Sequence, residues 1–209
     1  MGLLEGLHAH GRGALVSRPT RVHRAALVRA ARAGLPISFE ANGRIARLAG
    51  PIADGVAPGT VAVVTAGTAD VPTAEEAVSV LRAVGVTVVT SYDVGVAGIH
   101  RLQRALARLE LSHPSVYLVF AGREGALPTV VAGLVRAPVV GVPTSVGYGR
   151  GGRGEAALLA MLQSCAPVAV VNIDAAVPAA LFAVQLLAAA DGVRRSRRGR
   201  RRGGQPFDG

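Results

Sequence analysis

From residue 60 onward, the chain alternates between short apolar runs and longer segments whose apolar residues recur at helical spacing. Five apolar runs have the length and valine-rich composition of buried strands, and they are Val61–Thr65, Val86–Thr90, Ser115–Phe120, Pro138–Val142 and Val168–Ile173. The helical segments are Pro72–Val84, Ile99–Leu109, Val130–Val135, Glu155–Gln163 and Pro178–Ala190. Apolar strands separated by helices predict an α/β fold with a parallel sheet and right-handed crossovers.

The first 58 residues do not share this regularity. Arg21–Ala33 has the pattern of an amphipathic helix, whereas Met1–Arg18 shows no clear periodicity and predicts a loose arm. Asp54–Gly59, with its proline and glycines, is the expected boundary. We therefore expect an N-terminal arm and short helical region over residues 1–58, an α/β catalytic domain over 59–191 and a disordered Arg-rich tail over 192–209.

The composition indicates which residue types form the core and excludes some kinds of chemistry. Half of the residues are hydrophobic but only 3% are aromatic, so the core is expected to consist of valine, alanine and leucine. All 23 basic residues are arginine, which excludes Schiff-base chemistry and a P-loop lysine. Because Cys165 is the only cysteine, an internal disulfide is excluded and a reducing compartment is indicated.

Positive charge is concentrated near the C-terminus. Of the net charge of +10, much lies in Arg194–Gly209, which holds seven arginines and one aspartate. This segment lacks interleaved aromatic residues, so we expect a solvated tail with only weak contacts to nucleic acid. The longest apolar run, Ala175–Leu187, is shorter than the roughly 20 residues of a membrane span. With no secretory signal evident, we expect a cytoplasmic protein without a membrane partner.

The turn Ala121–Thr129 follows a strand-like run and precedes a helical one. It carries one acid, Glu124, between Gly122 and Gly125. Open parallel sheets bind ligands at the carboxyl ends of their strands, and glycines allow close backbone approach. Glu124 is therefore a candidate proton carrier or metal ligand. The alternative is an ordinary strand–helix connection with a solvated glutamate.

Two further turns carry candidate chemistry. In the first, backbone amides and the hydroxyls of Thr65 and Thr68 could hold a phosphate at a helix N-terminus, while Asp70 either caps that helix or orients a metal or a ribose hydroxyl. In the second, His100 and Arg101 begin a helix and suit an anion or a proton transfer, although a lone histidine is more often an ordinary surface residue.

Gly147–Gly152 matches the spacing G-x-G-x-x-G, but it does not lie in the first strand–helix turn and no acid follows at the ribose-binding distance. We expect a flexible loop there that closes over a ligand. Cys165 follows a helix, whose negative end disfavours a thiolate, so a reactive role would require a compensating positive charge.

Five motifs on successive strand–helix units together resemble the LarB family. They are Thr65–Asp70, Tyr92–Leu102, Ala121–Pro128, Gly141–Gly149 and Leu159–Pro167. The resemblance covers roughly Thr60–Leu187, and five ordered motifs are far more specific than any one of them. Members of this family are pyridinium-3,5-biscarboxylic acid mononucleotide synthases, which make the precursor of the nickel-pincer nucleotide cofactor.

The resemblance implies a PurE-like, flavodoxin-like α/β fold of three layers, with helices on both faces of a parallel sheet and a short N-terminal extension. It implies carboxylation of the pyridinium ring of nicotinic acid adenine dinucleotide at C5, and hydrolysis of the phosphoanhydride to release AMP. CO2 or bicarbonate would be the co-substrate, and no organic cofactor is implied. Mg²⁺ would suit the pyrophosphate, with Glu124 or Asp70 as a ligand. The implied assembly is a homo-octamer.

The resemblance also assigns roles to residues. Cys165 would form a covalent adduct with the ring, and Glu124 would remove a proton or place a metal. The residues implied in substrate binding lie in the strand–helix connections, and they are Thr65, Gly67, Thr68, Asp70, Asp93, Gly98, His100, Arg101, Gly122, Gly125 and Ser145.

A thiol is meaningful in this chemistry because a pyridinium ring is electron-poor and cannot attack CO2 directly. Addition of a thiolate at C4 would make a dienamine that is nucleophilic at C5. Loss of the C5 proton and of the thiolate would then restore the aromatic ring. Cys165 is the only residue of the chain that could play this part.

The same spacing is also similar to the PurE family of aminoimidazole ribonucleotide carboxylases. Those enzymes carry a histidine-containing run where this chain has Ala121–Pro128, and a Gln-Met-Pro type run where this chain has Ser164–Pro167. A purine-type carboxylase or mutase, which does not need Cys165, is therefore the second interpretation. A non-catalytic nucleotide-binding homologue is the third, because the N-terminal region is shorter than is usual in LarB proteins and Arg150–Gly154 replaces a less charged segment.

Topology raises one difficulty for the first interpretation. The turns at Asp70, Asp93, Glu124 and Ser145 are expected at the carboxyl edge of the sheet, whereas Cys165 ends a returning helix and is expected at the opposite edge. We therefore expect an active site that combines residues of different subunits.

Overall fold

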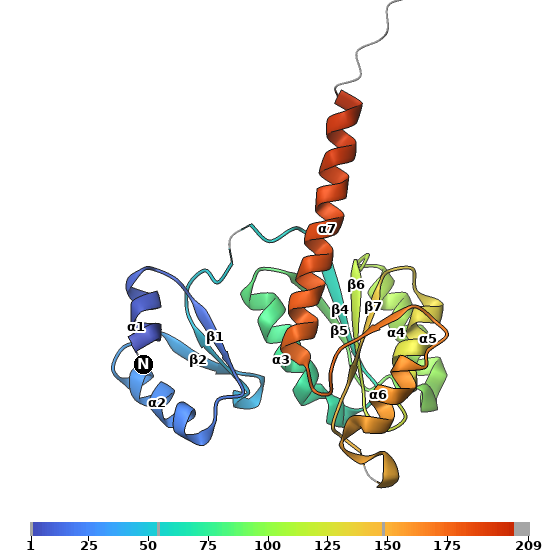
Figure 1. Cartoon of the computed structure of the whole chain (residues 1–209), viewed down its shortest axis with the longest axis horizontal. Coiled ribbons are helices and arrows are strands. Elements are labelled where there is room, and N and C mark those ends of the chain that lie inside the picture. Colours follow the sequence, from blue (N-terminus) through green and yellow to red (C-terminus); the bar gives the residue numbers. More distant parts are fainter. Residues whose placement is uncertain (1, 54, 148, 203–209) are drawn as a thin grey trace, which may run out of the picture.

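The computed structural model describes residues 2–53, 55–147 and 149–202, which form a small N-terminal unit and a larger α/β domain (Figure 1). The N-terminal unit contains α1 (Gly2–Ala9), β1 (Ala14–Ser17), α2 (Arg21–Arg32), β2 (Ile37–Glu40), the 3-10 turn η1 (Ala41–Gly43) and β3 (Ile45–Leu48). Its three strands form an antiparallel sheet in the order β1-β3-β2. Thr20 caps α2, since its hydroxyl accepts a hydrogen bond from the His23 amide.

The expectation of a loose arm over Met1–Arg18 is wrong, because α1 and β1 lie there. β1 has only four residues, and its partner β3 is about thirty residues away in sequence. Its place is set by pairing with β3, in the register that joins Ala14 to Leu48 and Ser17 to Ile45. So short a strand leaves no periodic signal of its own in the sequence.

The larger domain is organised around a five-stranded parallel sheet, as the sequence predicts. The strands are β4 (Thr60–Thr65), β5 (Thr87–Ser91), β6 (Val116–Ala121), β7 (Val139–Pro143) and β8 (Val168–Val170). Their order is β5-β4-β6-β7-β8, which is the flavodoxin-like order, and each neighbouring pair is parallel. Four strands begin and end within a residue of their predicted bounds, and β8 is shorter than predicted.

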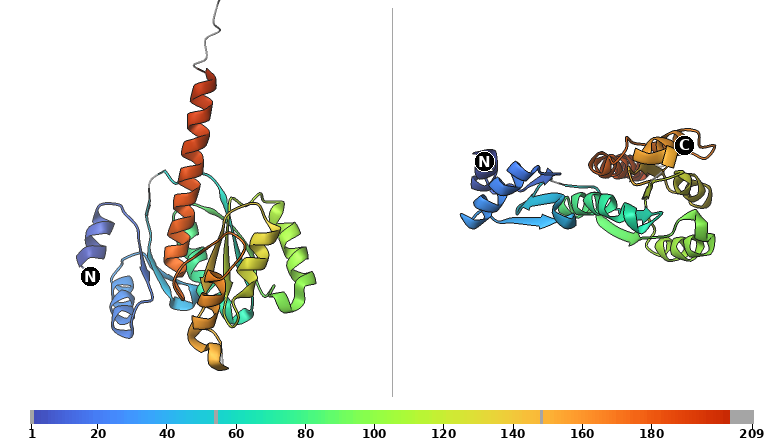
Figure 2. Two further views of the ribbon diagram at one scale, coloured as in Figure 1. Left: turned by 45° about the vertical axis from the view of Figure 1, so that its right-hand side comes forward. Right: turned by 90° about the horizontal axis from the view of Figure 1, so that it is seen from below.

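Helices cover both faces of this sheet and make three layers (Figure 2). They are α3 (Val71–Ala83), α4 (Ile99–Glu110), α5 (Ala126–Leu134), α6 (Glu155–Leu162) and α7 (Ala176–Arg202). α3 and α7 pack together on one face, whereas α4, α5 and α6 cover the other. The 3-10 turns η2 (Thr68–Asp70), η3 (Val96–Gly98) and η4 (Gly149–Gly154) lie in the connections that follow strands.

The core has the composition that the sequence predicts. All six residues of β6 are buried, and their side chains alternate between the two faces of the sheet. Leu118 and Phe120 pack towards α3 and α7, whereas Tyr117 and Val119 pack towards the other helices. Alanines such as Ala77 allow α3 and α7 to approach the sheet and each other closely.

α7 extends further than predicted and projects beyond the domain (Figure 1). The predicted disordered tail over 192–209 therefore differs from the structure, in which the helix continues to Arg202; residues 203–209 lie outside the described part. Arginine is a good helix former, so an arginine-rich segment can extend a helix that already exists. By length and composition alone, Ala176–Val193 is apolar enough to cross a membrane. Its inner residues, such as Ala183 and Leu187, are however buried in the core.

Candidate active site

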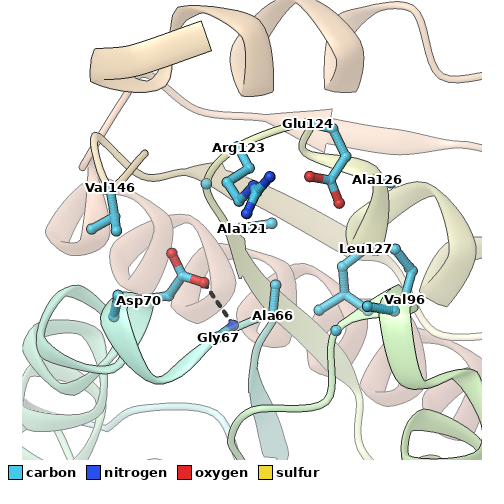
Figure 3. Close-up of a pocket in the computed structure, with 14 residues that line it drawn as sticks. Ala66, Gly67, Asp70, Val96, Ala121, Arg123, Glu124, Ala126, Leu127 and Val146 are labelled. Carbon is cyan, nitrogen blue, oxygen red and sulfur yellow. Dashed lines mark hydrogen bonds between the residues drawn. The ribbon is translucent and has the colours of Figure 1, made fainter. Parts of the chain in front are cut away.

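A pocket of about 440 Å³ lies at the carboxyl edge of the parallel sheet, beside β4 and β6 (Figure 3). These two strands flank the point at which the strand order reverses, where open α/β sheets bind ligands. The connections after four different strands contribute to the lining, which consists of Ala66, Gly67, Ala69, Asp70, Gly95, Val96, Ala97, Ala121, Gly122, Arg123, Glu124, Ala126, Leu127 and Val146.

Asp70 is the buried acid of this pocket, with 4% of its surface exposed. The Gly67 amide donates to one carboxylate oxygen at 2.8 Å, and the Thr144 hydroxyl donates to the other at 2.5 Å. Burial raises the pKa of Asp70, and these hydrogen bonds oppose that shift in part. The aspartate thus closes the turn at η2 by accepting from the Gly67 amide, but its side chain makes no capping hydrogen bond to α3, contrary to the capping interpretation. It also lines the pocket.

Thr65 and Asp93 are brought together, but through the backbone. The buried hydroxyl of Thr65 accepts a hydrogen bond from the Asp93 amide at 3.0 Å, so this threonine fixes the connection after β5. The Asp93 carboxylate forms an ion pair with Arg101 at 2.9 Å. Both side chains line a separate cavity along α4, and the exposed His100 lies on that helix too. The structure therefore separates Asp93, His100 and Arg101 from the pocket that contains Glu124.

The connection between β6 and α5 supplies the pocket's charged side chains. Arg123 and Glu124 are exposed in the opening of the pocket, and Figure 3 shows both side chains there. Glu124 was predicted from its place between two glycines after a strand. Arg123 was not predicted as a site residue, although it stands in the same turn; in a chain whose basic residues are all arginine, one more arginine carried little signal.

Gly122 and Gly125 are required by the geometry of this turn. A Cβ atom on Gly122 would lie 2.1 Å from the carbonyl oxygen of Val146, in the connection after β7. Gly125 has a φ of +63°, and a Cβ there would lie 2.6 Å from the carbonyl oxygen of Ala157. Neither contact can be relieved without moving backbone, so both glycines hold the turn against its neighbours.

The remaining predicted binding residues are divided between the pocket and the connections around it. Gly67 lines the pocket and Thr68 is exposed beside it. Gly98 is buried against the Arg101 side chain, away from the pocket. The Ser145 amide donates to the Asp174 carboxylate at 2.9 Å, which joins the connection after β7 to the connection after β8.

Cys165 lies outside this pocket, on the exposed segment between α6 and β8. The Ser164 hydroxyl accepts from the Ala166 amide and donates to the Ala166 carbonyl oxygen, which makes a tight local turn. Because β8 begins at Val168, the cysteine is at the amino edge of the sheet. A second cavity, of about 540 Å³ and mostly apolar, lies at this edge and includes Pro167 and Phe182.

Within residues 2–53, 55–147 and 149–202, no group of three histidine, cysteine, aspartate or glutamate side chains is arranged to hold a metal ion. Asp70 and Glu124 are the two carboxylates that line the pocket. A Mg²⁺ ion there would need further oxygen ligands from a substrate or water, as is common for this ion.

A family model described as AIR carboxylase matches residues 60–202. An uncharacterized protein of Methanocaldococcus jannaschii is 52% identical over 126 residues, which are 60% of this chain and 48% of that protein. This chain thus spans about half the length of that relative.

An N5-carboxyaminoimidazole ribonucleotide mutase of Methanocaldococcus jannaschii is 35% identical over 125 residues, covering 58% of this chain and 74% of the mutase. Among solved structures, Treponema denticola PurE is 23% identical with a TM-score of 0.49, and the match covers 69% of this chain and 93% of that one. The family match lies in the domain that holds the pocket.

Proposed function

The chain belongs to the AIR carboxylase family, and within this carboxylase family we propose that it acts on nicotinic acid adenine dinucleotide. The proposed reaction adds CO2 to the pyridinium ring at C5 and hydrolyses the phosphoanhydride. The products are pyridinium-3,5-biscarboxylic acid mononucleotide, a precursor for nickel-pincer cofactor synthesis, and AMP. The five motifs that resemble the LarB family support this substrate over others.

The observation that carries the proposal is the pairing of charges in the pocket. Arg123 and Glu124 present a cation and an anion from one turn (Figure 3). The nicotinate ring of the substrate is itself zwitterionic, with a cationic ring and a carboxylate. An arginine suits the carboxylate and a glutamate suits the cationic ring, whereas a carboxyaminoimidazole has a carboxylate for the arginine but no cationic ring for the glutamate.

Glu124 also suits a proton transfer. The proposed sequence begins when the Cys165 thiolate adds to ring C4, which gives a dienamine. The C5 carbon then forms a bond to CO2, and the ring nitrogen becomes an iminium. Glu124 takes the C5 proton, and departure of the thiolate from C4 restores the pyridinium ring. The net change is replacement of one ring hydrogen by a carboxylate, with release of a proton.

This sequence requires a second copy of the chain, because Cys165 and Glu124 lie at opposite edges of the sheet in one copy. In our proposal the exposed Cys165 of one subunit enters the pocket of another, within a homo-octamer. The cationic ring would supply the positive charge that favours the thiolate.

Mg²⁺ would fit this site with oxygen ligands from both the protein and the substrate. Asp70 or Glu124 would hold it together with the pyrophosphate oxygens, since this ion commonly uses one or two carboxylates plus phosphates. It would neutralise charge on the phosphoanhydride during hydrolysis.

A second candidate function is the rearrangement of N5-carboxyaminoimidazole ribonucleotide. It is favoured by the 35% identity to the mutase of Methanocaldococcus jannaschii over most of that protein. Because aminoimidazole is electron-rich, this reaction needs no thiol, so the two functions make opposite demands on Cys165.

The experiment that tests the proposal is mass spectrometry of the products formed from nicotinic acid adenine dinucleotide, Mg²⁺ and isotope-labelled bicarbonate. A labelled dicarboxylated pyridinium mononucleotide together with AMP is expected. The same preparation is then supplied with N5-carboxyaminoimidazole ribonucleotide. Turnover of this substrate alone would replace the proposal with the mutase function, and turnover of neither by a folded, assembled protein would indicate a nucleotide-binding homologue without catalysis.

A further inference from the structure

A further cavity, of about 400 Å³, opens between the N-terminal unit and the larger domain. It is lined by Arg18, Pro19, Arg24, Asn42, Arg44 and Asp174. Five of these six residues come from the N-terminal unit and its connections, and the sixth follows β8. We call this cavity the arginine cleft.

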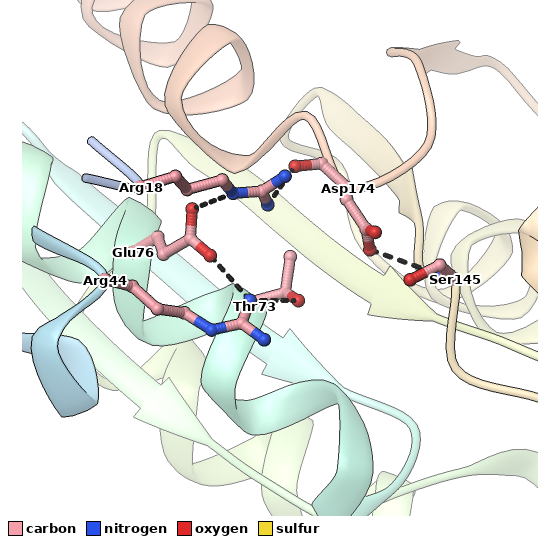
Figure 4. Close-up of polar contacts among 6 residues, drawn as sticks. All are labelled: Arg18, Arg44, Thr73, Glu76, Ser145 and Asp174. Atoms are coloured by element: carbon pink, nitrogen blue, oxygen red, sulfur yellow. Dashed lines mark hydrogen bonds and ion pairs between the residues drawn. The ribbon is translucent and has the colours of Figure 1, made fainter. Parts of the chain in front are cut away.

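The arginine cleft is built around a buried carboxylate. Glu76 of α3 is 1% exposed, and each of its oxygens accepts a hydrogen bond from a different arginine (Figure 4). Arg18 donates at 2.8 Å and Arg44 at 2.7 Å. The two arginines lie next to each other, at the paired ends of β1 and β3. Glu76 therefore fixes two guanidinium groups side by side at the mouth of the cleft.

The third arginine is held in a different way. The Arg24 guanidinium lies over the Phe39 ring, 5.2 Å from the ring centre, and this contact restrains its orientation. Arg18 and Arg44 keep 46% and 43% of their side chains exposed. Each guanidinium has five N–H donors, and the bonds to Glu76 use only part of them. Donors thus remain for a ligand in the cleft.

The balance of charge favours an anion. Three guanidinium groups line the cleft; Glu76 pairs with two of them, and the carboxylate of Asp174, which also lines the cleft, accepts instead from the Ser145 amide. Glu76 is enclosed by its two partners, so the surface that a ligand meets is dominated by arginine. Several rigidly held arginines converging on one cavity are typical of phosphate recognition.

The arginine cleft adjoins the candidate active site. Arg18 donates to the Asp174 carbonyl oxygen at 2.6 Å, and the Asp174 carboxylate accepts from the Ser145 amide at 2.9 Å (Figure 4). The next residue, Val146, lines the pocket that contains Glu124. One short connection therefore separates the two cavities.

We propose that the arginine cleft is a phosphate-binding subsite that takes the phosphate of the adenylate half of the substrate. The choice of ligand rests on the proposed function, since a dinucleotide carries a second phosphate beyond the nicotinate half. The subsite gives the N-terminal unit a role in selecting a dinucleotide over a mononucleotide.

Isothermal titration calorimetry of the full chain with AMP, inorganic pyrophosphate and adenosine tests the subsite without any turnover. AMP and pyrophosphate are expected to bind, more weakly as salt is raised, and adenosine is expected not to bind. The variant Arg24→Gln should bind both about five- to tenfold more weakly, the size expected when one partly exposed charged hydrogen bond is lost. Arg24 has no ion-pair role among the described contacts, so its loss spares the Glu76 cluster.

The matched control is Arg29→Gln, which removes the same charge from an exposed position of the same helix but outside the cleft. It should bind AMP as the wild type does. A second variant, Asp174→Asn, should bind about two- to fivefold more tightly, because it removes a negative charge from the cleft wall. Asp174 has a φ of +55°, which asparagine tolerates, and the amide oxygen can still accept from Ser145.

Equal binding by the wild type and Arg24→Gln would overturn the subsite, as would equal weakening by Arg24→Gln and Arg29→Gln. Absence of AMP binding by the wild type would overturn it as well. These outcomes are independent of carboxylation. A protein that binds AMP in the cleft but carboxylates nothing would contradict the proposed function alone, and labelled product from the Arg24→Gln variant at unchanged KM would contradict the subsite alone.

Discussion

At the carboxyl edge of the parallel sheet, connections from four strands converge on one pocket, whereas at the amino edge Cys165 lies on an exposed segment beside an apolar cavity. The carboxyl edge is held by short polar contacts, such as those of Asp70 with Gly67 and Thr144. At the amino edge, the segment around Cys165 is held by the two hydrogen bonds between the Ser164 hydroxyl and the backbone of Ala166.

This difference suggests that the two edges contribute different kinds of groups to one active site. Groups that must meet a substrate in a fixed geometry are located where strands of the same copy end together. A nucleophile on an exposed segment can instead be delivered to a neighbouring copy. The proposed chemistry needs both edges, so the predictions below test whether they act on the same substrate.

The largest expected effect is that of Cys165→Ala. If the thiol forms the ring adduct, this variant should lose carboxylation by at least about a thousandfold, since no other residue can replace a covalent nucleophile. Binding of nicotinic acid adenine dinucleotide to the pocket should persist, because the nucleotide contacts lie at the other edge. Product formation by mass spectrometry and binding by calorimetry check both points. Unchanged turnover would indicate that the amino edge has no part in the chemistry.

Glu124→Gln should slow carboxylation by about a hundredfold, the usual size of a lost proton acceptor. Mixing this variant with Cys165→Ala provides the sharper test, because each protein keeps the group that the other lacks. If a site combines two copies, co-refolded mixtures should regain about a quarter of the wild-type sites by random assembly. Mixtures that stay inactive, although they assemble, would contradict a shared site.

Glycine-to-alanine substitutions at the two edges should change the free energy of unfolding in opposite directions. Gly122→Ala at the carboxyl edge should destabilise the fold by about 1–3 kcal/mol, because its Cβ would overlap the Val146 carbonyl oxygen. Gly133→Ala, near the amino end of the sheet in α5, meets nothing within 4 Å and should stabilise the helix by up to about 1 kcal/mol. Chemical denaturation of both variants measures the difference, and equal effects would show that the carboxyl-edge turn can relax.

The smallest expected effect concerns the pH dependence of stability at Asp70. Burial raises its folded-state pKa, so the folded protein holds a proton that the unfolded chain has released. The resulting stabilisation is present below about pH 4, the ordinary pKa of an aspartate, and is lost as pH rises through the raised folded-state pKa. Relative to Asp70→Asn, the wild type should therefore become less stable as pH rises from about 4 towards neutrality. Urea unfolding of both proteins over this range checks the sign, and a rising relative stability would contradict it.

The sheet could be predicted from the sequence because each parallel strand is a buried apolar run bounded by turn residues. The N-terminal unit could not, since strands as short as β1 gain their stability from partners that lie far along the chain. The arginine cleft could not be predicted from the sequence for the same reason. Arg18 and Glu76 are 58 residues apart, and no local pattern pairs them.

Some features of the candidate site could likewise be predicted from the sequence, and others could not. Glu124 and its flanking glycines follow from the rule that ligands meet the carboxyl ends of strands, and so does the place of Cys165 at the other edge. The role of Thr65 did not follow, because its hydroxyl holds the Asp93 amide instead of facing the pocket. The direction of a side chain depends on neighbouring connections, and a single sequence does not show how those connections lie relative to one another.

The packing of α7 has a consequence for the order in which the domain is made. Ala179, Ala183 and Leu187 share one core cluster with β4 and α3, the first elements of the domain. During synthesis from the N-terminus, this half of the core stays open to solvent until the last helix has been added. Closure then depends on contacts that span more than a hundred residues, which is characteristic of slowly folding parallel sheets. The nascent domain therefore exposes the apolar side of β6 and β7 until α7 has been made.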